Sequence, residues 1–200
     1  MGPLAIAQYM VAATFFSVAL MHFLVWYRNT YYRVHLLFAL TALTAGANSI
    51  AEAGVYSATT LDTFIPAFKW YVTFSALWLI AFIWFVGVWT GISAIRRRWL
   101  ITLSAVFCAA LVINFLAPCG ILFTEITQLR QVQLSWGDQI ALPEGLSSPW
   151  RYGTDIAMIG VLVLVVDGWR NLRQQGKQRS AWLLGGSLLL FFLFFLSMLI

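Results

Sequence analysis

The sequence predicts an all-α polytopic membrane protein with six transmembrane helices and a small β-hairpin cap in one long loop. Of its 200 residues, 62% are hydrophobic and 10% are charged, and mean hydropathy is +0.85. Soluble domains have about 45–50% apolar and about 25% charged residues. Long apolar stretches recur along the chain, and basic residues gather in alternate connections. These observations exclude a soluble enzyme, a secreted disulfide scaffold and a disordered chain.

Six stretches approach the roughly 20 predominantly apolar residues that a spanning helix needs. They lie at about residues 5–27, 34–56, 65–92, 99–117, 154–169 and 181–200. The first is not a cleaved signal peptide, because no Lys or Arg precedes it and its apolar stretch is longer than a signal peptide's. We therefore expect residues 1–200 to form a single membrane domain.

The basic residues predict the orientation. Nine of the twelve lie in the first, third and fifth connections, and six of the seven acids lie on the other side. Cytoplasmic connections carry an excess of Lys and Arg, so these three are predicted to be cytoplasmic and the N-terminus to lie outside. The net charge of +5 then reflects topology and indicates no nucleic-acid partner. The nine are Arg28, Arg33, Arg96, Arg97, Arg98, Arg170, Arg173, Lys177 and Arg179.

The same orientation makes a prediction about the C-terminus. Six spans bring the chain back outside, and no polar flank follows the apolar run 188–200. We expect a longer parent protein in which a seventh span leads to a cytoplasmic output domain.

Residues 118–152 form the long outer loop. Residues 131–136 alternate polar and apolar side chains, which is the period of a half-buried strand. Gly137-Asp138 separates them from residues 139–142, which predicts a two-residue hairpin turn, in a sheet of two or three strands. Pro143, Gly145 and Pro149 are typical of a following loop. An open sheet edge cannot lie in lipid, so this cap is placed on the outer face, either as a cover or as a sensing or docking element.

Four polar residues within the spans are candidates for ligand sensing, since polar groups in a membrane are costly. Asn48 and Glu52 share a helix face, and Lys69 lies near the same outer end of the next span. A Glu52–Lys69 pair is predicted, either as an interfacial pair or as the polar floor of an outer pocket. Asn114 lies one turn from the outer end of the fourth span and is expected to hydrogen-bond across helices.

Further candidates lie in the cap and at the cytoplasmic face. Glu125, Arg130, Trp136 and Trp150 are the sensing candidates of the cap. Asp167 and Arg170 are three residues apart near the cytoplasmic end, where an ion pair is expected. They are candidates for coupling a signal to the cytoplasm, with a plain interfacial pair as the alternative.

His22 and His35 are placed to face each other across two antiparallel helices. Bis-histidine haem or metal ligation needs that arrangement, but packed histidines are the more common outcome, and no metal or cofactor is predicted. The third span carries an aromatic stripe on one face, which either packs against neighbours or lines a ligand pocket. The stripe consists of Trp70, Phe74, Trp78, Phe82, Phe85 and Trp89.

No catalytic residues are predicted. The sequence holds no G-x-S-x-G, no H-E-x-x-H and no phosphate-binding glycine loop, so we expect no enzymatic activity of this chain. Cys108 and Cys119 are separated by about 16 Å if the chain between them is helical, which is too far for a disulfide.

The chain resembles the seven-helix N-terminal membrane sensor region of bacterial signalling proteins that carry PAS and histidine-kinase domains. Two departures from that pattern are the missing seventh helix and output domain, so this chain cannot itself phosphorylate a substrate. The resemblance rests on residues 114–116, 124–127, 129–130, 136–138, 148–151, 166–168 and 184–187.

The resemblance implies a sensory input module of a two-component system in a bacterial inner membrane, with a homodimer as the expected assembly. Two alternatives remain open. One is an oligomeric transporter, channel or assembly subunit complete at 200 residues, and the other is a cofactor protein that uses the two histidines.

Overall fold

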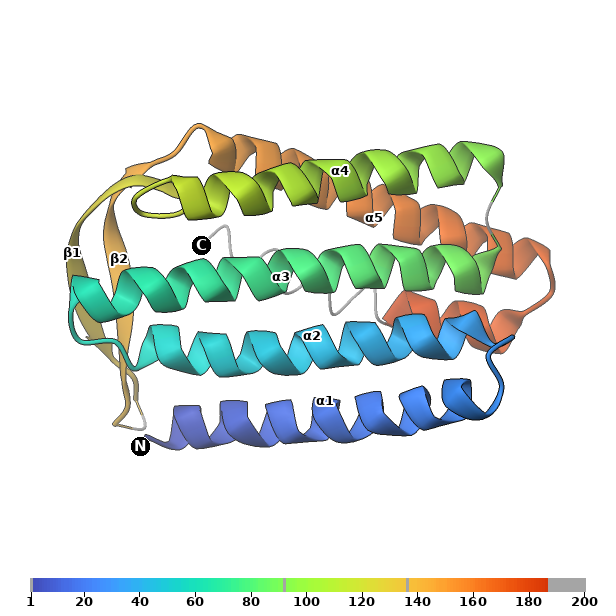
Figure 1. Cartoon of the computed structure of the whole chain (residues 1–200), viewed down its shortest axis with the longest axis horizontal. Coiled ribbons are helices and arrows are strands. Elements are labelled where there is room, and N and C mark those ends of the chain that lie inside the picture. The colour runs from blue at the N-terminus through green and yellow to red at the C-terminus, as the bar shows by residue number, and fades with distance from the viewer. Residues whose placement is uncertain (1, 92, 136, 187–200) are drawn as a thin grey trace.

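Within the described part of the chain, five long helices run side by side in alternating directions, and a β-hairpin closes one end of the bundle (Figure 1). The computed structural model describes residues 2–91, 93–135 and 137–186. Each of the five helices is long and apolar enough to cross a membrane. The elements are α1 (Pro3–Arg28), α2 (Arg33–Tyr56), α3 (Leu61–Thr90), α4 (Ala94–Leu116), β1 (Phe123–Gln133), β2 (Gln139–Ser147) and α5 (Trp150–Gln174).

The sixth predicted span, 181–200, falls only in part on described residues. A helical segment begins at residue 178 and is described as far as residue 186, and residues 187–200 lie outside the described part of the chain. Within the described chain, five helices thus meet the length and apolarity that a membrane span needs, rather than the six expected.

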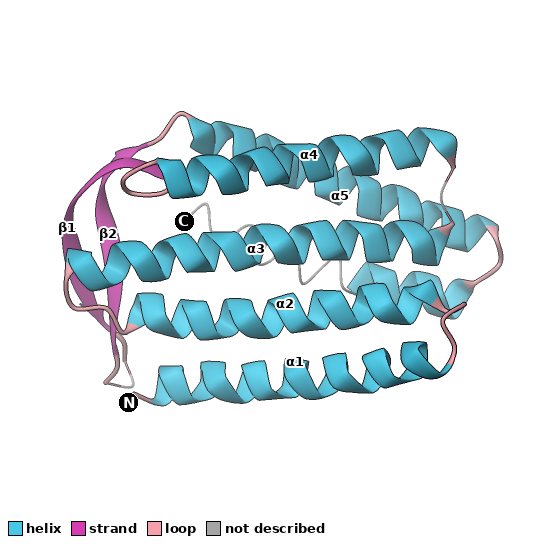
Figure 2. Ribbon diagram, viewed as in Figure 1, coloured by secondary structure: helices cyan, strands magenta, loops and turns pink. Residues whose placement is uncertain are grey.

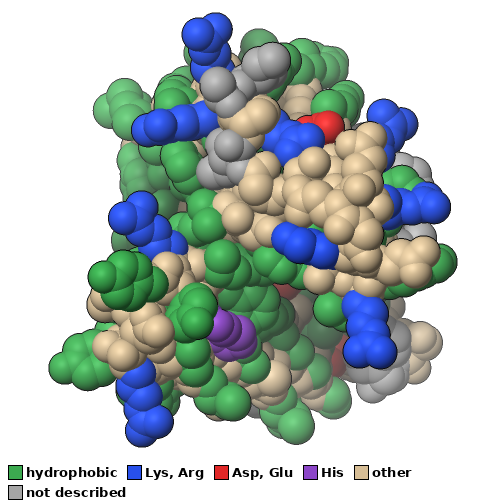
Figure 3. Space-filling model, turned by 90° about the vertical axis from the view of Figure 1, so that its right-hand side faces the viewer, with side chains coloured by type: hydrophobic (Ala, Val, Ile, Leu, Met, Phe, Trp, Pro, Cys, Tyr) green, Lys and Arg blue, Asp and Glu red, His purple; other side chains and the backbone are tan. Residues whose placement is uncertain are grey.

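The connections separate cleanly between the two ends of the bundle. The turns 29–32 and 175–177 lie at one end together with Gly91 and Ser93, where α3 ends and α4 begins; this end is here called the basic end, and the hairpin lies at the other, the hairpin end (Figure 2). A view onto the basic end shows Lys and Arg side chains distributed over it (Figure 3). The alternation of basic residues along the sequence therefore becomes a separation of charge in space.

Three helices begin earlier than hydropathy predicts, and α3 does so at Leu61 rather than near 65. α4 begins at Ala94 rather than near 99, because the Ser93 side chain accepts a hydrogen bond from the Arg96 backbone N–H at 3.3 Å and arginine favours helix. α5 runs from Trp150 to Gln174 rather than over 154–169. Polar residues at a helix end fail the apolarity that a span needs, but they do not end the helix.

The hairpin is confirmed, but its turn and its extent differ from the prediction. β1 runs from Phe123 to Gln133 and β2 starts at Gln139, so the connection is longer than the two residues predicted, and the Leu134 N–H donates to the Asp138 carbonyl at 2.7 Å. β1 and β2 form an antiparallel two-stranded sheet, with no third strand among the described residues.

Pro143 and Gly145 lie inside β2 and not in a loop. A two-stranded sheet consists of edge strands, which tolerate proline. Gly145 pairs with Ile126 beside an irregularity in register, where a Cβ atom would lie 2.0 Å from the Glu125 carbonyl oxygen. The strand can therefore pass this point only with glycine.

Helix α3 is the centre of the packing and contacts α2, α4, α5 and β1. One buried cluster joins α3 to α4, α5 and the segment 178–186, and it includes Ile83, Val86 and Val161. A second cluster at the hairpin end joins α3 to the hairpin through Phe64, Phe68 and Ile126. Cys108 and Cys119 are unpaired, as predicted.

Helix α1 is held more loosely. It buries only Ala12 and Ala19, and it approaches α2 at Gly46, where a Cβ atom would lie 2.8 Å from the Phe16 ring. Many of its large apolar side chains are exposed, which suits contact with lipid tails.

Candidate functional site: an aromatic cavity with a histidine pair

A cavity of about 750 Å³ lies between α1, α2, α3 and the segment 178–186. This volume falls within the range of about 300–1,000 Å³ that is typical of small-molecule sites. The described residues around it are mainly aromatic and aliphatic. They are Phe15, His22, Val34, His35, Phe38, Thr41, Ala45, Asn48, Ser49, Trp78, Phe82, Phe85, Trp89, Leu183 and Leu184.

Part of the aromatic stripe of α3 forms one wall of this cavity. Trp78, Phe82, Phe85 and Trp89 line it, and Phe85 and Trp89 stack at 5.5 Å between ring centroids. From the opposite helix, Phe38 meets Phe85 edge-on at 5.2 Å. Such contacts fix the ring planes and present a rigid aromatic surface.

The rest of the stripe serves packing. Trp70 stacks on Phe74 at 5.7 Å and meets Phe115 of α4 at 5.7 Å, away from the cavity. One half of the stripe thus lines a cavity, and the other half packs against neighbouring aromatic side chains.

His22 of α1 and His35 of α2 are in direct contact at the cavity. Their Nδ1 atoms lie 2.9 Å apart, which makes one ring the donor and the other the acceptor. The short turn 29–32 reverses the chain and brings the two rings together, as their positions in the sequence predict. Phe38 packs on His22 with ring centroids 4.3 Å apart, and Tyr32 meets His35 edge-on.

Three further polar side chains of α2 line the cavity. The Thr41 hydroxyl donates to the Leu37 carbonyl at 2.8 Å, and the Ser49 hydroxyl donates to the Ala45 carbonyl at 3.2 Å. Asn48 accepts a 2.8 Å hydrogen bond at Oδ1 from Ser75 of α3. Asn48, a predicted sensing residue, is therefore a residue of this cavity.

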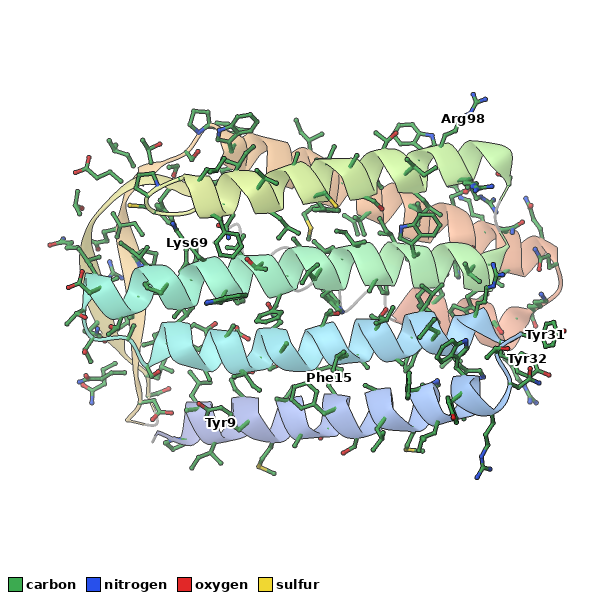
Figure 4. The ribbon with its side chains drawn as sticks, viewed as in Figure 1. Tyr9, Phe15, Tyr31, Tyr32, Lys69 and Arg98 are labelled. Carbon is green, nitrogen blue, oxygen red and sulfur yellow. The ribbon has the colours of Figure 1, made fainter. Side chains whose placement is uncertain are left out.

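The predicted Glu52–Lys69 pair is wrong. Glu52 accepts hydrogen bonds from Gln8 at 3.0 Å and from the Tyr56 hydroxyl at 2.7 Å. Lys69 lies on the side of α3 that faces α4, whereas Glu52 faces α1 (Figure 4). Glu52 and Lys69 thus lie near the same end of two adjacent helices, but on faces that do not meet.

Asn114 is confirmed as a link between helices. Its fully buried side chain donates to the Lys69 carbonyl at 2.9 Å and to the Thr73 hydroxyl at 3.3 Å, and it accepts from the Ile121 N–H at 3.2 Å. This arrangement ties α4, α3 and the start of the hairpin together. These hydrogen bonds have a structural role and are distant from the cavity, because Asn114 lies on the α4 side of α3.

The sensing candidates of the cap do not gather into one site. Arg130 pairs with Glu144 at 3.6 Å on the exposed surface of the hairpin, and Glu125 is also exposed. Trp150 is exposed at the start of α5, and Trp136 lies outside the described residues. The hairpin instead carries anchors that sequence reasoning missed. Gln131 donates to the Ala58 carbonyl at 3.3 Å, and Asp138 accepts from the Leu4 N–H at 2.7 Å.

A second polar joint lies at the basic end. Asp167 of α5 forms an ion pair with Arg96 of α4, which corrects the predicted pairing with Arg170. Asn171 donates to the Thr90 carbonyl at 2.6 Å, and Arg96 also donates to the Gly91 carbonyl at 3.1 Å. The turn between α3 and α4 is therefore fixed to α5. The signal in the sequence was the capped helix start at Ser93, which places Arg96 inside the first turn of α4.

No cluster of three or more His, Cys, Asp or Glu side chains with metal-binding geometry occurs among residues 2–91, 93–135 and 137–186. The candidate site is therefore the cavity, with its neutral polar groups and aromatic walls. Comparison with family models, curated proteins and solved structures finds no match for this chain.

Proposed function

We propose that the chain is a sensory input module of a bacterial inner membrane. A small apolar ligand occupies the aromatic cavity, and its occupancy is transmitted to the basic end, which faces the cytoplasm. The observation that carries this proposal is the cavity itself, because three helices and the segment 178–186 meet around it and its two histidines belong to the helix ends at the turn 29–32.

The packing supports a route for such a signal. α1 and α2 contribute one side of the cavity, and the aromatic stripe of α3 contributes the other. α3 ends at Thr90, whose carbonyl accepts a hydrogen bond from Asn171 of α5. A ligand that separates α2 from α3 would therefore displace the turn that carries Gly91 and Arg96. Helix shifts of about 1–2 Å are typical of such transitions.

We further propose that the module forms a homodimer and acts on a cytoplasmic output domain in a longer parent protein. A ligand can shift an equilibrium only by its difference in affinity for the two states. The cavity must then differ in size or shape between the two signalling states, and filling it should mimic the ligand.

The test uses Ala45→Phe, which places a ring into the cavity. Nitroxide labels at Tyr31 and Arg98, both at the basic end (Figure 4), report the spacing between the α1–α2 turn and α4 by electron paramagnetic resonance. The background carries Cys108→Ala and Cys119→Ala, because these thiols would also be labelled. We expect a shift of about 1–2 Å or more in the label distance.

Ala105→Phe is the matched control, because Ala105 lies on the exposed face of α4. The control should leave the distance unchanged. A folded Ala45→Phe variant with the distance distribution of the natural chain would contradict the proposed function, since filling the cavity would then have no effect at the basic end.

A further inference from the structure

We propose that the cavity binds the head ring of a lipid-soluble quinone, with a ring carbonyl hydrogen-bonded to the His22–His35 pair. This inference rests on the proposed function and names its ligand class. It follows from three properties of the cavity, namely its walls, its polar groups and its position in the bundle.

The walls suit a flat ring. Phe38 and Phe85 meet edge-on, and Phe85 stacks with Trp89, so aromatic surfaces from α2 and α3 face the same space. Offset stacking between aromatic rings adds a favourable interaction beyond the apolar area that is buried. A cavity of about 750 Å³ holds a substituted ring together with part of a tail.

The lining of the cavity disfavours a ligand with a charged head group. None of the described residues that line the cavity is Asp, Glu, Lys or Arg. A phosphate or carboxylate buried there would lack a counter-charge, which is costly. The hydroxyls of Thr41 and Ser49 already donate to carbonyls of their own helix. The groups best placed to bind a ligand are therefore the histidine pair and the Asn48 amide nitrogen.

The histidine pair offers both kinds of hydrogen bond. In a neutral pair the ring that donates through Nδ1–H has a bare Nε2, and the ring that accepts at Nδ1 carries its proton on Nε2. The pair thus has one N–H and one lone pair left for other partners. The N–H can donate to a quinone carbonyl, and the lone pair can accept from the hydroxyl of the reduced form. An apolar lipid would use neither atom.

The position of the pair suits a tailed molecule. Histidine is visible in the view onto the basic end, so the polar end of the cavity lies at a surface of the bundle (Figure 3). Asn48 lies thirteen residues further along α2, about 20 Å away at 1.5 Å per residue. A head ring held at the histidines leaves the apolar length of the cavity for the tail.

The test measures binding of a benzoquinone with a ten-carbon tail to the full chain in lipid nanodiscs. Trp78 and Trp89 line the cavity, so bound quinone should quench tryptophan fluorescence in a saturable way. His22→Phe and His35→Phe keep an aromatic ring at each position but remove the nitrogens. We expect each to raise Kd about tenfold, and decylbenzene, which lacks carbonyls, to compete about tenfold more weakly than the quinone.

Two further variants keep the test interpretable. Tyr9→Phe removes a polar atom from an aromatic residue of α1 outside the cavity and should leave Kd unchanged (Figure 4). His35→Asn retains a donor and an acceptor and should keep most of the affinity even if His35→Phe unfolds. Non-saturable quenching, or Kd values of both His→Phe variants within about twofold of the natural chain, would overturn the quinone proposal.

The two proposals fail in different ways. If Ala45→Phe moves the basic end but the quinone does not bind, the ligand class is wrong and the sensory function stands. If the quinone binds at the histidines but the Tyr31–Arg98 spacing is the same with and without Ala45→Phe, the site stands and the sensory function is wrong.

Discussion

Asp138 at the tip of the hairpin accepts a hydrogen bond at 2.7 Å from the backbone N–H of Leu4, 134 residues earlier in the chain. Helix α1 has Gly2 at its N-cap and no acid in its first turn, so it lacks a cap of its own. The hairpin supplies both the acceptor and the negative charge that the helix dipole favours at this end. Asp138 therefore holds the start of α1, a helix that buries only Ala12 and Ala19.

Replacing this cap should free the start of α1. We expect Asp138→Ala to cost about 0.5–2 kcal/mol of helix stability, because the Leu4 N–H loses its partner. Amide hydrogen exchange at residues 4–8 should accelerate accordingly. Asp138→Asn keeps an acceptor oxygen, so its exchange rates should lie between those of Asp138→Ala and those of the natural chain. Equal exchange rates in all three proteins would show that the hairpin does not hold α1.

Asn114 should be the most sensitive asparagine of the described chain. Asn114→Leu removes three hydrogen bonds and leaves the Ile121 N–H buried without its acceptor, at an expected cost of about 1–3 kcal/mol. Reversible unfolding in mixed detergent micelles measures this loss. Asn29→Ala removes an exposed hydrogen bond in the turn 29–32 and should cost less than about 0.5 kcal/mol. Equal losses for the two variants would contradict the role of Asn114 as a joint.

The ion pair at the basic end makes a prediction about coupling. Arg96 and Asp167 should show a coupling energy of about 0.5–1 kcal/mol in a double-mutant cycle of Arg96→Gln and Asp167→Asn, a modest value because the Asp167 side chain is 49% exposed. The parallel cycle with Arg170→Gln should show a smaller coupling. A larger coupling for Arg170 would restore the i, i+3 pair that the helix spacing suggests.

The helices were predictable because apolar length and helix direction are local properties. The alternation of basic residues also predicted which connections share an end of the bundle. The predicted helix ends were less accurate. Hydropathy detects the apolar stretch that contacts lipid, whereas capping residues such as Ser93 determine where the helical backbone begins. The connection between the two strands was predicted too short: Gly137-Asp138 is a strong turn signal and does lie between the strands, but β1 already ends at Gln133.

The candidate site was predictable only in its parts. The contact of His22 with His35 and the aromatic face of α3 each followed from spacing within a helix or across one short turn. Their meeting around one cavity depends on the rotation of α2 against α3, which sequence spacing does not determine. The same unknown rotation made the Glu52–Lys69 pair wrong, because Lys69 belongs to the opposite side of α3.

The proposed orientation predicts opposite accessibility for the two ends of the bundle. In a background with Cys108→Ala and Cys119→Ala, Ser135→Cys places a thiol in the hairpin loop, and Gln175→Cys places one at the basic end, both at exposed positions. Because basic connections stay in the cytoplasm, a membrane-impermeant maleimide should label Ser135→Cys from the outer side of the inner membrane. It should label Gln175→Cys only after that membrane is permeabilised. The reverse pattern would invert the proposed orientation and place the histidine end of the cavity on the outer side.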